Sequence, residues 1–443
     1  YNAIALSVML QNKYKFLHCV LRLLWFTGKK LGDPEALCIG YPMLVILCVK
    51  NVFWSAAKYY MEKAYTLSIK SSNDAIIAQL LMVNGFFHQF RGNYLKSNDF
   101  FTKGIAIFER IGDMGSSLYC RIGLIEMYAL QADHDNTLQL LTPFSHMVRK
   151  FGNIIGIAHA LTKQAQLAYE KGNLKEAEKK ALEGLNFSKT HNVQIGESAT
   201  SSLLGAIYLE KNQTARASGH LRQGMDIYHG KAVFGEWSIW NFPLYAEALI
   251  SIRLVNNEIS LKQIKKACKI ALAKTRTWIN YHGVSLRVYA IYLSLVKRHR
   301  RAEKMFLKSI RLLQTLNRRF ELALSQRAYG YFLRENGRYE AALSQFNQAW
   351  TIFNELGSAF RDRIVNYPGP GDPAKATAQR VADIHKKDIA FNPSKQLAAF
   401  GDIQALTRYI LKTSMKIAGA QGGCLFLLDR KSGLLHLTAK SHT

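Results

Sequence analysis

The stretch that decides the fold covers residues 330–349 and reads GYFLRENGRYEAALSQFNQA. Counted from Gly330, its small and aromatic residues lie 7, 12, 16 and 19 positions on, at Gly337, Ala342, Phe346 and Ala349. The last three are spaced by four and three, which places them on one face of a helix. Gly337 suits the left-handed backbone that ends a helix. The stretch therefore predicts two helices joined by a tight turn, with small residues where the helices cross.

The same offsets recur upstream, and consecutive clear copies are 40 residues apart. The clear copies begin at Gly85, Ala165, Gly205, Ala290 and Gly330, and a degraded one is expected at Ala57, Met61 and Ala64. Lys297 stands where the copy led by Ala290 should have its Gly or Asn. The copy led by Gly123 looks degenerate, because Asp135 occupies its small-residue position. Residues 235–273 are expected to hold another divergent pair. A non-repetitive helical bundle is the alternative.

These offsets resemble the tetratricopeptide repeat, whose standard length is about 34 residues. The longer interval here predicts longer helices or loops. One helix pair cannot bury its apolar face alone, so neighbouring pairs must stack. The resemblance implies an all-α, tetratricopeptide-like, right-handed superhelical solenoid of about seven or eight helix pairs, which we place at residues 1–365.

The composition changes after the array. Residues 367–373 read YPGPGDP and cannot continue a helix, so we predict a Pro/Gly-rich linker with a connector helix at 366–395. From residue 397 to 418 the apolar residues have helical spacing. Residues 424–429 and 434–439 have strand character, with a turn at Lys431-Ser432-Gly433 between them.

Residues 418–429, which read AGAQGGCLFLLD, resemble the opening of a GAF domain, and GLLHL at 433–437 resembles its second strand. The resemblance implies that residues 396–443 are the N-terminal fragment of an α/β GAF domain. The order of repeats, linker and GAF start is similar to the central region of large bacterial sensor histidine kinases that carry an ATPase module upstream. It implies a cytoplasmic protein-interaction and signal-relay region. An ATPase-type transcriptional regulator with repeats and a stand-alone repeat scaffold are the alternatives.

Motifs for catalysis or metal binding are missing from the sequence. It contains no phosphate-binding G-x-x-x-x-G-K-[ST], no H-E-x-x-H and no G-x-S-x-G. No two of the 13 His lie three or four residues apart, and the six Cys form no C-x-x-C pair. We therefore expect no catalytic residue, no metal and no cofactor in this chain, and we leave open whether the parent protein is an enzyme.

Apolar residues are concentrated at 36–49, a run that is too short for the roughly 20 residues of a membrane span. We expect this run to lie in the protein core, and we expect no membrane partner. The scattered Cys are expected to be buried thiols in a reducing cytoplasm.

Charge is concentrated in one segment. The chain has 59 Lys and Arg against 31 Asp and Glu, and residues 257–320 contain 16 of the former and only two of the latter. The densest part is a basic patch at Lys297, Arg298, Arg300 and Arg301. A solvated basic face is the first interpretation and docking of an acidic domain or peptide the second. Nucleic acid is disfavoured, because no stacking aromatics or recognition helix accompany the charge.

Repeat solenoids bind partners on a concave surface that the first helix of each pair lines. The predicted groove residues lie three before, one after and four after each lead residue: Met82, Phe86, Gln89, Arg287, Arg327, Tyr331 and Arg334. We expect the three arginines to bind a carboxylate-rich protein segment through charge-assisted hydrogen bonds. The alternative is that they pair with Glu residues of the same chain or with solvent.

Overall fold

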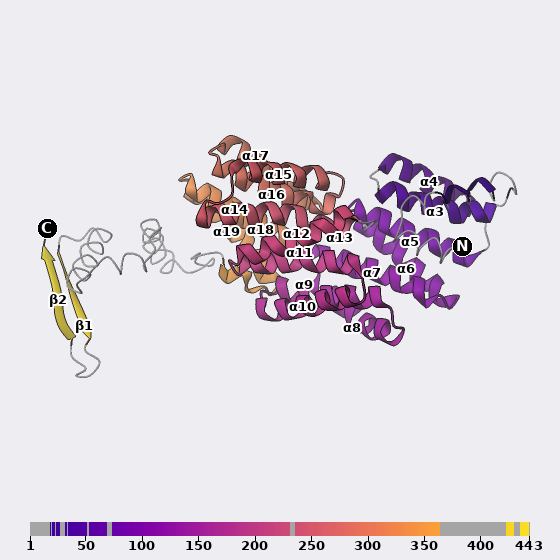
Figure 1. The fold of residues 1–443 in the computed structure, drawn as a ribbon, viewed down its shortest axis with the longest axis horizontal. Coiled ribbons are helices and arrows are strands. Elements are labelled where there is room, and N and C mark those ends of the chain that lie inside the picture. The colour runs from indigo at the N-terminus through magenta and orange to yellow at the C-terminus, as the bar shows by residue number, and fades with distance from the viewer. Residues whose placement is uncertain are drawn as a thin grey trace. The chain divides into compact units, whose positions relative to one another are not determined.

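The computed structural model describes most of the chain. The described ranges are residues 34–50, 53–68, 73–230, 235–363, 422–428 and 435–442, with a few residues between 18 and 32. The chain divides into two compact units, one ending at Arg361 and one beginning at Asp362. The first unit is built from helices, and Figure 1 labels them in chain order.

The described helices of the first unit form eight hairpins of neighbouring helices, with one short helix inserted before the sixth. The hairpins are α3 (Pro34–Lys50) with α4 (Trp54–Ser68), α5 (Asp74–Phe90) with α6 (Tyr94–Arg110), α7 (Met114–Gln131) with α8 (His134–Lys150), α9 (Ile154–Glu170) with α10 (Leu174–Thr190), α11 (Gln194–Glu210) with α12 (Thr214–Gly230), α14 (Asn241–Asn256) with α15 (Leu261–Thr275), α16 (Ile279–Leu295) with α17 (His299–Thr315), and α18 (Arg319–Glu335) with α19 (Tyr339–Glu355). The inserted helix is α13 (Gly235–Ile239), and the 3₁₀ helix η2 (Ala359–Arg363) follows α19. The predicted solenoid of helix pairs is confirmed, as is the divergent pair expected within residues 235–273.

The turns explain the repeat length of 40. Residues with a left-handed backbone recur every 20 positions, at Gly92, Gly112, Ala132, Gly152, Gly172, Asn192 and Asn212. Most helices between them have 17 residues, so a turn of about three residues completes each step. The extra length over the standard repeat therefore lies in the helices. Lys297 adopts the left-handed conformation although it is not Gly, with a φ of 58°.

The pair α7 and α8 corrects the expectation of a degenerate copy at Gly123. The left-handed residue of this pair is Ala132, nine rather than seven positions after Gly123. Counted from that turn, Thr137 and not Asp135 occupies the small-residue position, and its side chain is fully buried. The turn at Ala132 keeps the 20-residue interval, so the position seven before it, which corresponds to the lead residue, is the buried Ile125 and not Gly123.

At several helix crossings an aromatic ring packs directly against a Gly, which leaves room for the ring because it has no side chain. A Cβ atom at Gly85 would lie 2.5 Å from the ring of Phe101, and one at Gly123 would also collide with that ring. Gly330 stands in the same relation to Phe346, at 2.5 Å. The ring of Phe101 thus lies between two helices of consecutive pairs and joins them.

Replacing Phe101 by Ala should lower the free energy of unfolding by about 3–5 kcal/mol, because the cavity would open between two helix pairs. Urea unfolding followed by circular dichroism measures the change. The matched control is Phe151→Ala, since the Phe151 side chain is 52% exposed and should contribute little. Equal effects of the two substitutions would contradict the role given to Phe101.

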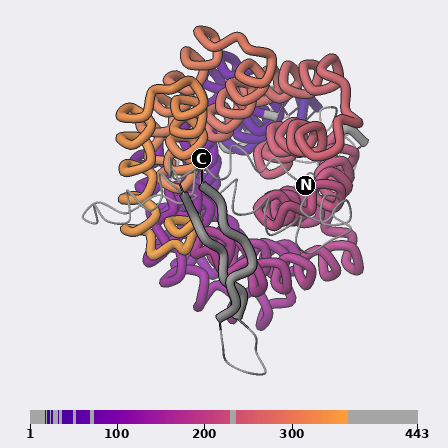
Figure 2. Tube along the Cα trace, turned by 90° about the vertical axis from the view of Figure 1, so that its left-hand side faces the viewer, coloured from indigo at the N-terminus to yellow at the C-terminus, as the bar shows by residue number. Residues whose placement is uncertain are grey.

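The described helices wind around a common axis until distant repeats touch (Figure 2). The side-chain amide of Asn280 donates a hydrogen bond to the backbone oxygen of Gln89 at 3.1 Å. The ring of Trp278 lies 5.5 Å from that of Phe90. A Cβ atom at Gly92 would collide with Leu316. The hairpin of α16 and α17 therefore closes against that of α5 and α6.

A second closing contact joins η2 to the end of α9. The backbone N–H of Ala359 donates to the backbone oxygen of Lys171 at 3.0 Å. The ring of Tyr169 lies 5.6 Å from that of Phe320 and 5.4 Å from that of Phe360. These contacts and those at Asn280 make the array a closed superhelix rather than an open one.

The second unit is described only as a hairpin. Strand β1 (Gly422–Leu428) pairs antiparallel with β2 (Leu435–His442), with a register irregularity between Leu425 and Phe426. The strands fall where the sequence predicts them, but a two-stranded hairpin occurs in many folds and does not identify a GAF domain. The predicted linker and the helices at 374–390 and 397–418 lie outside the described residues.

The apolar run at 36–49 belongs to α3, and its described side chains Cys38, Met43, Val45 and Val49 are buried in the core, as predicted. Among the described helices, none combines the length and apolar character required to cross a bilayer.

Candidate functional site

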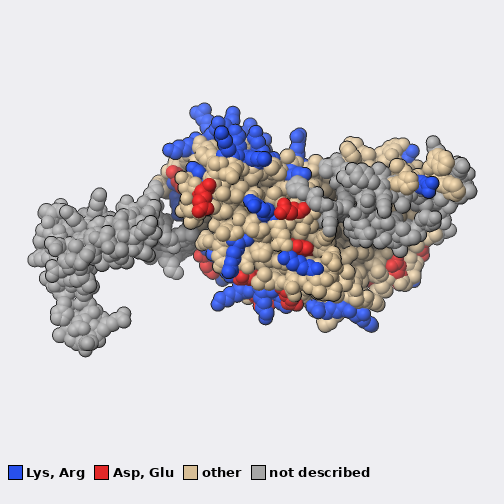
Figure 3. Space-filling model, in the orientation of Figure 1, with Lys and Arg blue, Asp and Glu red and all other residues tan. Residues whose placement is uncertain are grey.

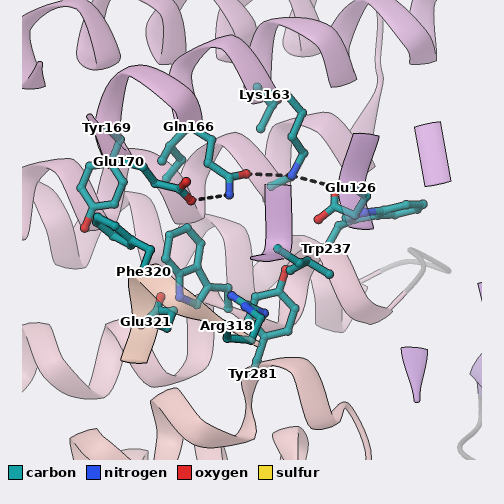
Figure 4. A pocket seen from close by; sticks show the side chains of 15 residues that line it. Glu126, Lys163, Gln166, Tyr169, Glu170, Trp237, Tyr281, Arg318, Phe320 and Glu321 are labelled. Atoms are coloured by element: carbon teal, nitrogen blue, oxygen red, sulfur yellow. Dashed lines mark hydrogen bonds and ion pairs between the residues drawn. The ribbon is translucent and has the colours of Figure 1, made fainter. Parts of the chain in front are cut away.

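The first helices of the pairs converge on a small interior cavity (Figure 4). Its volume is about 40 Å³, enough for a few water molecules and no more. The lining side chains come from six helices, the inserted α13 among them, and from the two turns before α14 and α18. They are Glu126, Leu130, Thr162, Lys163, Gln166, Tyr169, Glu170, Ala199, Leu203, Trp237, Trp240, Tyr281, Arg318, Phe320 and Glu321.

Charged and amide side chains form a continuous chain along one wall of this cavity. The ammonium group of Lys163 lies 2.6 Å from a carboxylate oxygen of Glu126 and donates to Gln166 at 2.8 Å. The amide of Gln166 donates to Glu170 at 2.8 Å, and His134 contacts the other oxygen of Glu170 at 2.8 Å. Burial alone would raise the pKa of Glu126, but the charge of Lys163 and its hydrogen bond lower it. The charge of Lys163 therefore compensates the burial of the Glu126 carboxylate in this wall.

A second cluster lies where the hairpin of α5 and α6 meets α16. The hydroxyl of Tyr94 donates to the side-chain oxygen of Asn280 at 2.9 Å, and Asn280 donates in turn to Glu236. Arg318 donates to the backbone oxygen of Asn280 at 2.7 Å. Burial raises the pKa of Glu236 to about 8, and Glu126 adds to the shift. The second carboxyl oxygen of Glu236 has no hydrogen-bond partner among the described residues.

Two of the predicted groove arginines, one buried and one partly buried, are already paired with carboxylates. Arg287 is only 3% exposed, and its guanidinium lies 2.6 Å from Glu321 and 3.7 Å from Glu247. Arg327 lies 2.8 Å from Glu210, a residue 117 positions away in the sequence. This is the arrangement that the alternative interpretation of these arginines describes.

The other predicted groove residues lie in helix contacts or at the surface of α18. Arg334 stacks over the ring of Tyr331, with 5.2 Å between the guanidinium carbon and the ring centre. Phe86 packs edge-on against Phe101, and Met82 is half-buried in the same core. The side chain of Gln89 is fully buried, and neither of its polar atoms has a hydrogen-bond partner among the described residues. Partner binding by these residues stays a prediction.

The predicted basic patch lies at the start of α17 and in the turn before it. Lys297, Arg298, Arg300 and Arg301 are all exposed. It is therefore on the outer layer of the array, away from the interior cavity.

Reactive chemistry is not favoured by the environment of the described thiols and imidazoles. Burial raises the pKa of Cys120 and of Cys268 to about 12, so both stay protonated and unreactive. Burial lowers the pKa of His159 to about 3, which keeps its ring neutral. Across the described ranges, no group of three or more His, Cys, Asp or Glu side chains could hold a metal ion. Cys19 and Cys424 lie outside the described side chains.

Sequence reasoning missed the interior charges. Glu126, Lys163 and Glu236 lie on the buried faces of their helices, each 6% exposed or less. A signal exists at Glu126, which interrupts the apolar run GLIEMYAL at residues 123–130. A charged residue on the apolar face of a helix needs a buried partner, but the sequence does not say which one.

No protein-family model matches the chain, and no curated protein matches it in sequence. Three solved structures give the scale of structural similarity. The Rap protein complexed with competence and sporulation factor is 12% identical, with 87% of this chain and 99% of that one covered and a TM-score of 0.45. The apo form of the quorum sensor NprR from B. thuringiensis is 13% identical, with 80% and 97% covered and a TM-score of 0.47. A STAND protein with a tetratricopeptide repeat sensor from Pyrococcus horikoshii is 14% identical, with 86% and 53% covered and a TM-score of 0.36. These similarities are too weak to carry a function to this chain, and its own hairpins and turns identify it as a tetratricopeptide-like helical repeat protein.

Proposed function

We propose that the array is a protein-interaction and signal-relay region that works by changing between a closed and an open superhelix. The observation that carries this proposal is the ion pair of Arg327 with Glu210, which spans 117 residues. It closes the interior with the same kind of bond that a carboxylate-rich partner would form with Arg327. A partner segment would therefore compete with Glu210, and its binding would loosen contacts between distant repeats.

This proposal predicts that Glu210→Gln raises affinity for an acidic segment, because it leaves the charge of Arg327 available. The probe is a fluorescein-labelled peptide rich in Glu, and fluorescence anisotropy measures its binding. We expect an increase in affinity of roughly tenfold, which corresponds to one charge-assisted hydrogen bond. Arg327→Glu should abolish the binding.

The matched control is Glu178→Gln, which breaks the ion pair of Glu178 with Lys211 between α10 and α11. It frees a Lys to a similar degree but leaves Arg327 paired. An equal gain for Glu178→Gln and Glu210→Gln would show non-specific charge attraction and would end the proposal, as would no gain in either variant.

We further propose that the region belongs to a larger cytoplasmic signalling protein of the sensor histidine kinase type, with residues 396–443 opening a GAF domain. The support is the sequence resemblance of residues 418–437 and the order of repeats, linker and GAF start. The sequence of the gene beyond Thr443 tests it. The rest of a GAF domain, a phosphoacceptor helix and an ATP-binding domain are expected there. A helix-turn-helix segment would favour a transcriptional regulator, and a stop codon would favour a stand-alone scaffold.

A further inference from the structure

The outer faces of α15 and α17 carry cations without compensating acids. Nine of these side chains are exposed, at Lys262, Lys265, Lys266, Lys269, Arg300, Arg301, Lys304, Lys308 and Arg311. No described carboxylate forms an ion pair with any of the nine. The nearest acid in the sequence of α17, Glu303, is held instead by Arg338 at 2.5 Å. We call these nine residues the basic face.

The two helices of the basic face have a common neighbour. Helices α15 and α17 both pack against α16. Along α17, the cations Arg300, Lys304 and Lys308 are spaced by four, which keeps them on one side of the helix. Figure 3 shows the Lys and Arg side chains gathered at the top of the view, over the position of α17.

Large aliphatic side chains are exposed beside and among these cations. Leu254 and Val255, at the end of α14, are 66% and 78% exposed, and Leu261, at the start of α15, is 37% exposed. Leu307 lies among the cations of α17 and is 48% exposed. The turn that follows Val255 leads directly into α15, so these aliphatic residues lie at the same edge as the first cations.

We propose that the basic face docks on an anionic phospholipid surface. Its Lys and Arg side chains would lie against lipid phosphates, and Leu254, Val255 and Leu307 would enter the boundary between head groups and acyl chains. The exposed aliphatic residues favour a lipid surface over a nucleic acid, because phosphates alone offer them no apolar environment. The predominance of Lys also suits diffuse attraction to head groups better than bidentate recognition of carboxylates.

This inference is independent of the proposed opening of the array, since it involves the outer layer only. It departs from the expectation that the chain has no membrane partner. That expectation was drawn from the lack of a membrane-spanning run, whereas the exposure of Leu254, Val255 and Leu307 is visible only in the structure.

Co-sedimentation with vesicles tests the proposal. The full chain is mixed at physiological salt with vesicles of phosphatidylcholine containing about one-third phosphatidylglycerol. We expect binding to these vesicles and none to pure phosphatidylcholine. A variant with Lys265, Lys266, Lys304 and Lys308 changed to Ser should lose about a hundredfold or more in partition coefficient. Changing Lys175, Lys179, Lys180 and Lys189 of α10 to Ser removes the same charge elsewhere and should have little effect.

A second variant separates lipid from nucleic acid. Leu254→Ser, Val255→Ser and Leu307→Ser together should weaken vesicle binding roughly tenfold, and binding to a short DNA duplex should not change. Circular dichroism checks that each variant is folded. Lack of binding to the anionic vesicles would overturn the proposal. If the triple Ser variant bound anionic vesicles as tightly as the unchanged protein, the proposal would also be overturned, and the basic face would be a general polyanion surface.

Discussion

Replacing Arg287 by Met should lower the free energy of unfolding by about 3–5 kcal/mol, although the two side chains have similar volumes. The loss arises because the carboxylate of Glu321, which is only 3% exposed, would remain buried without its partner. Urea unfolding of the full chain, followed by circular dichroism and by the fluorescence of buried Trp278, measures the change. If Arg287 instead served only to bind an external partner, the substitution would change the free energy of unfolding little.

Two further variants isolate the cause. Changing both Arg287 and Glu321 to Met should recover most of the lost stability, because an apolar pair replaces the buried ion pair. Arg319→Met breaks the ion pair with Glu355, whose side chains are 35% and 54% exposed, and should cost about 0–1 kcal/mol. If Arg287→Met behaved like Arg319→Met, the ion pair of Arg287 would not be structural.

Replacing Glu236 by Gln should stabilise the protein at pH 9 but hardly at pH 4.5. The native state keeps the carboxyl proton up to a pKa of about 8, whereas the unfolded chain loses it near the ordinary value of 4.5. Between these values the native state binds more protons, so rising pH favours unfolding. The Gln side chain is neutral at every pH and can still accept the hydrogen bond from Asn280. The free energy of unfolding of the variant, relative to the original protein, should therefore be roughly 3–5 kcal/mol higher at pH 9 than at pH 4.5.

Thermal unfolding of both proteins across this pH range measures the gain. Titrating groups that do not interact with Glu236 contribute equally to the two proteins, so the difference between them reports Glu236 together with its interaction with Glu126. Glu335→Gln removes an exposed carboxylate and serves as the control, with no expected trend. A stabilisation that is constant with pH would contradict the burial of an ionisable Glu236.

The repeat could be predicted from the sequence because its signals are local. Gly330 and Phe346 lie 16 residues apart and contact each other within one hairpin, so their spacing alone reports the contact. The turn residues are as local, and Gly92, Gly172 and Gly337 all adopt the expected left-handed backbone. The copy at Gly123 could not be placed from the sequence, because Ile125 occupies its lead position, where a small residue is expected, and Ala132 its turn position, where Gly or Asn is expected.

The interior could not be predicted, because its contacts join residues that lie far apart in the sequence. Tyr94 and Asn280 are 186 positions apart and form a hydrogen bond, but no sequence pattern in either helix indicates that the two residues are in contact. For Arg287 and Arg327 the spacing predicts the inward direction of the side chain but leaves open whether a partner protein or a Glu of the same chain faces it. Glu321 reaches Arg287 from the next helix pair, 34 positions on, whereas Glu210 meets Arg327 only across 117 positions.

Closure also changes how the array can evolve and unfold. An open solenoid gains or loses a repeat with little penalty, because each unit touches only its neighbours. Here the side chain of Asn280 must reach the backbone oxygen of Gln89, and the backbone N–H of Ala359 must reach the backbone oxygen of Lys171. Deleting one hairpin between them would place the wrong residues opposite each other. Such an array is committed to its number of repeats, and its denaturation should resemble the all-or-none transition of a globular domain rather than fraying from the ends.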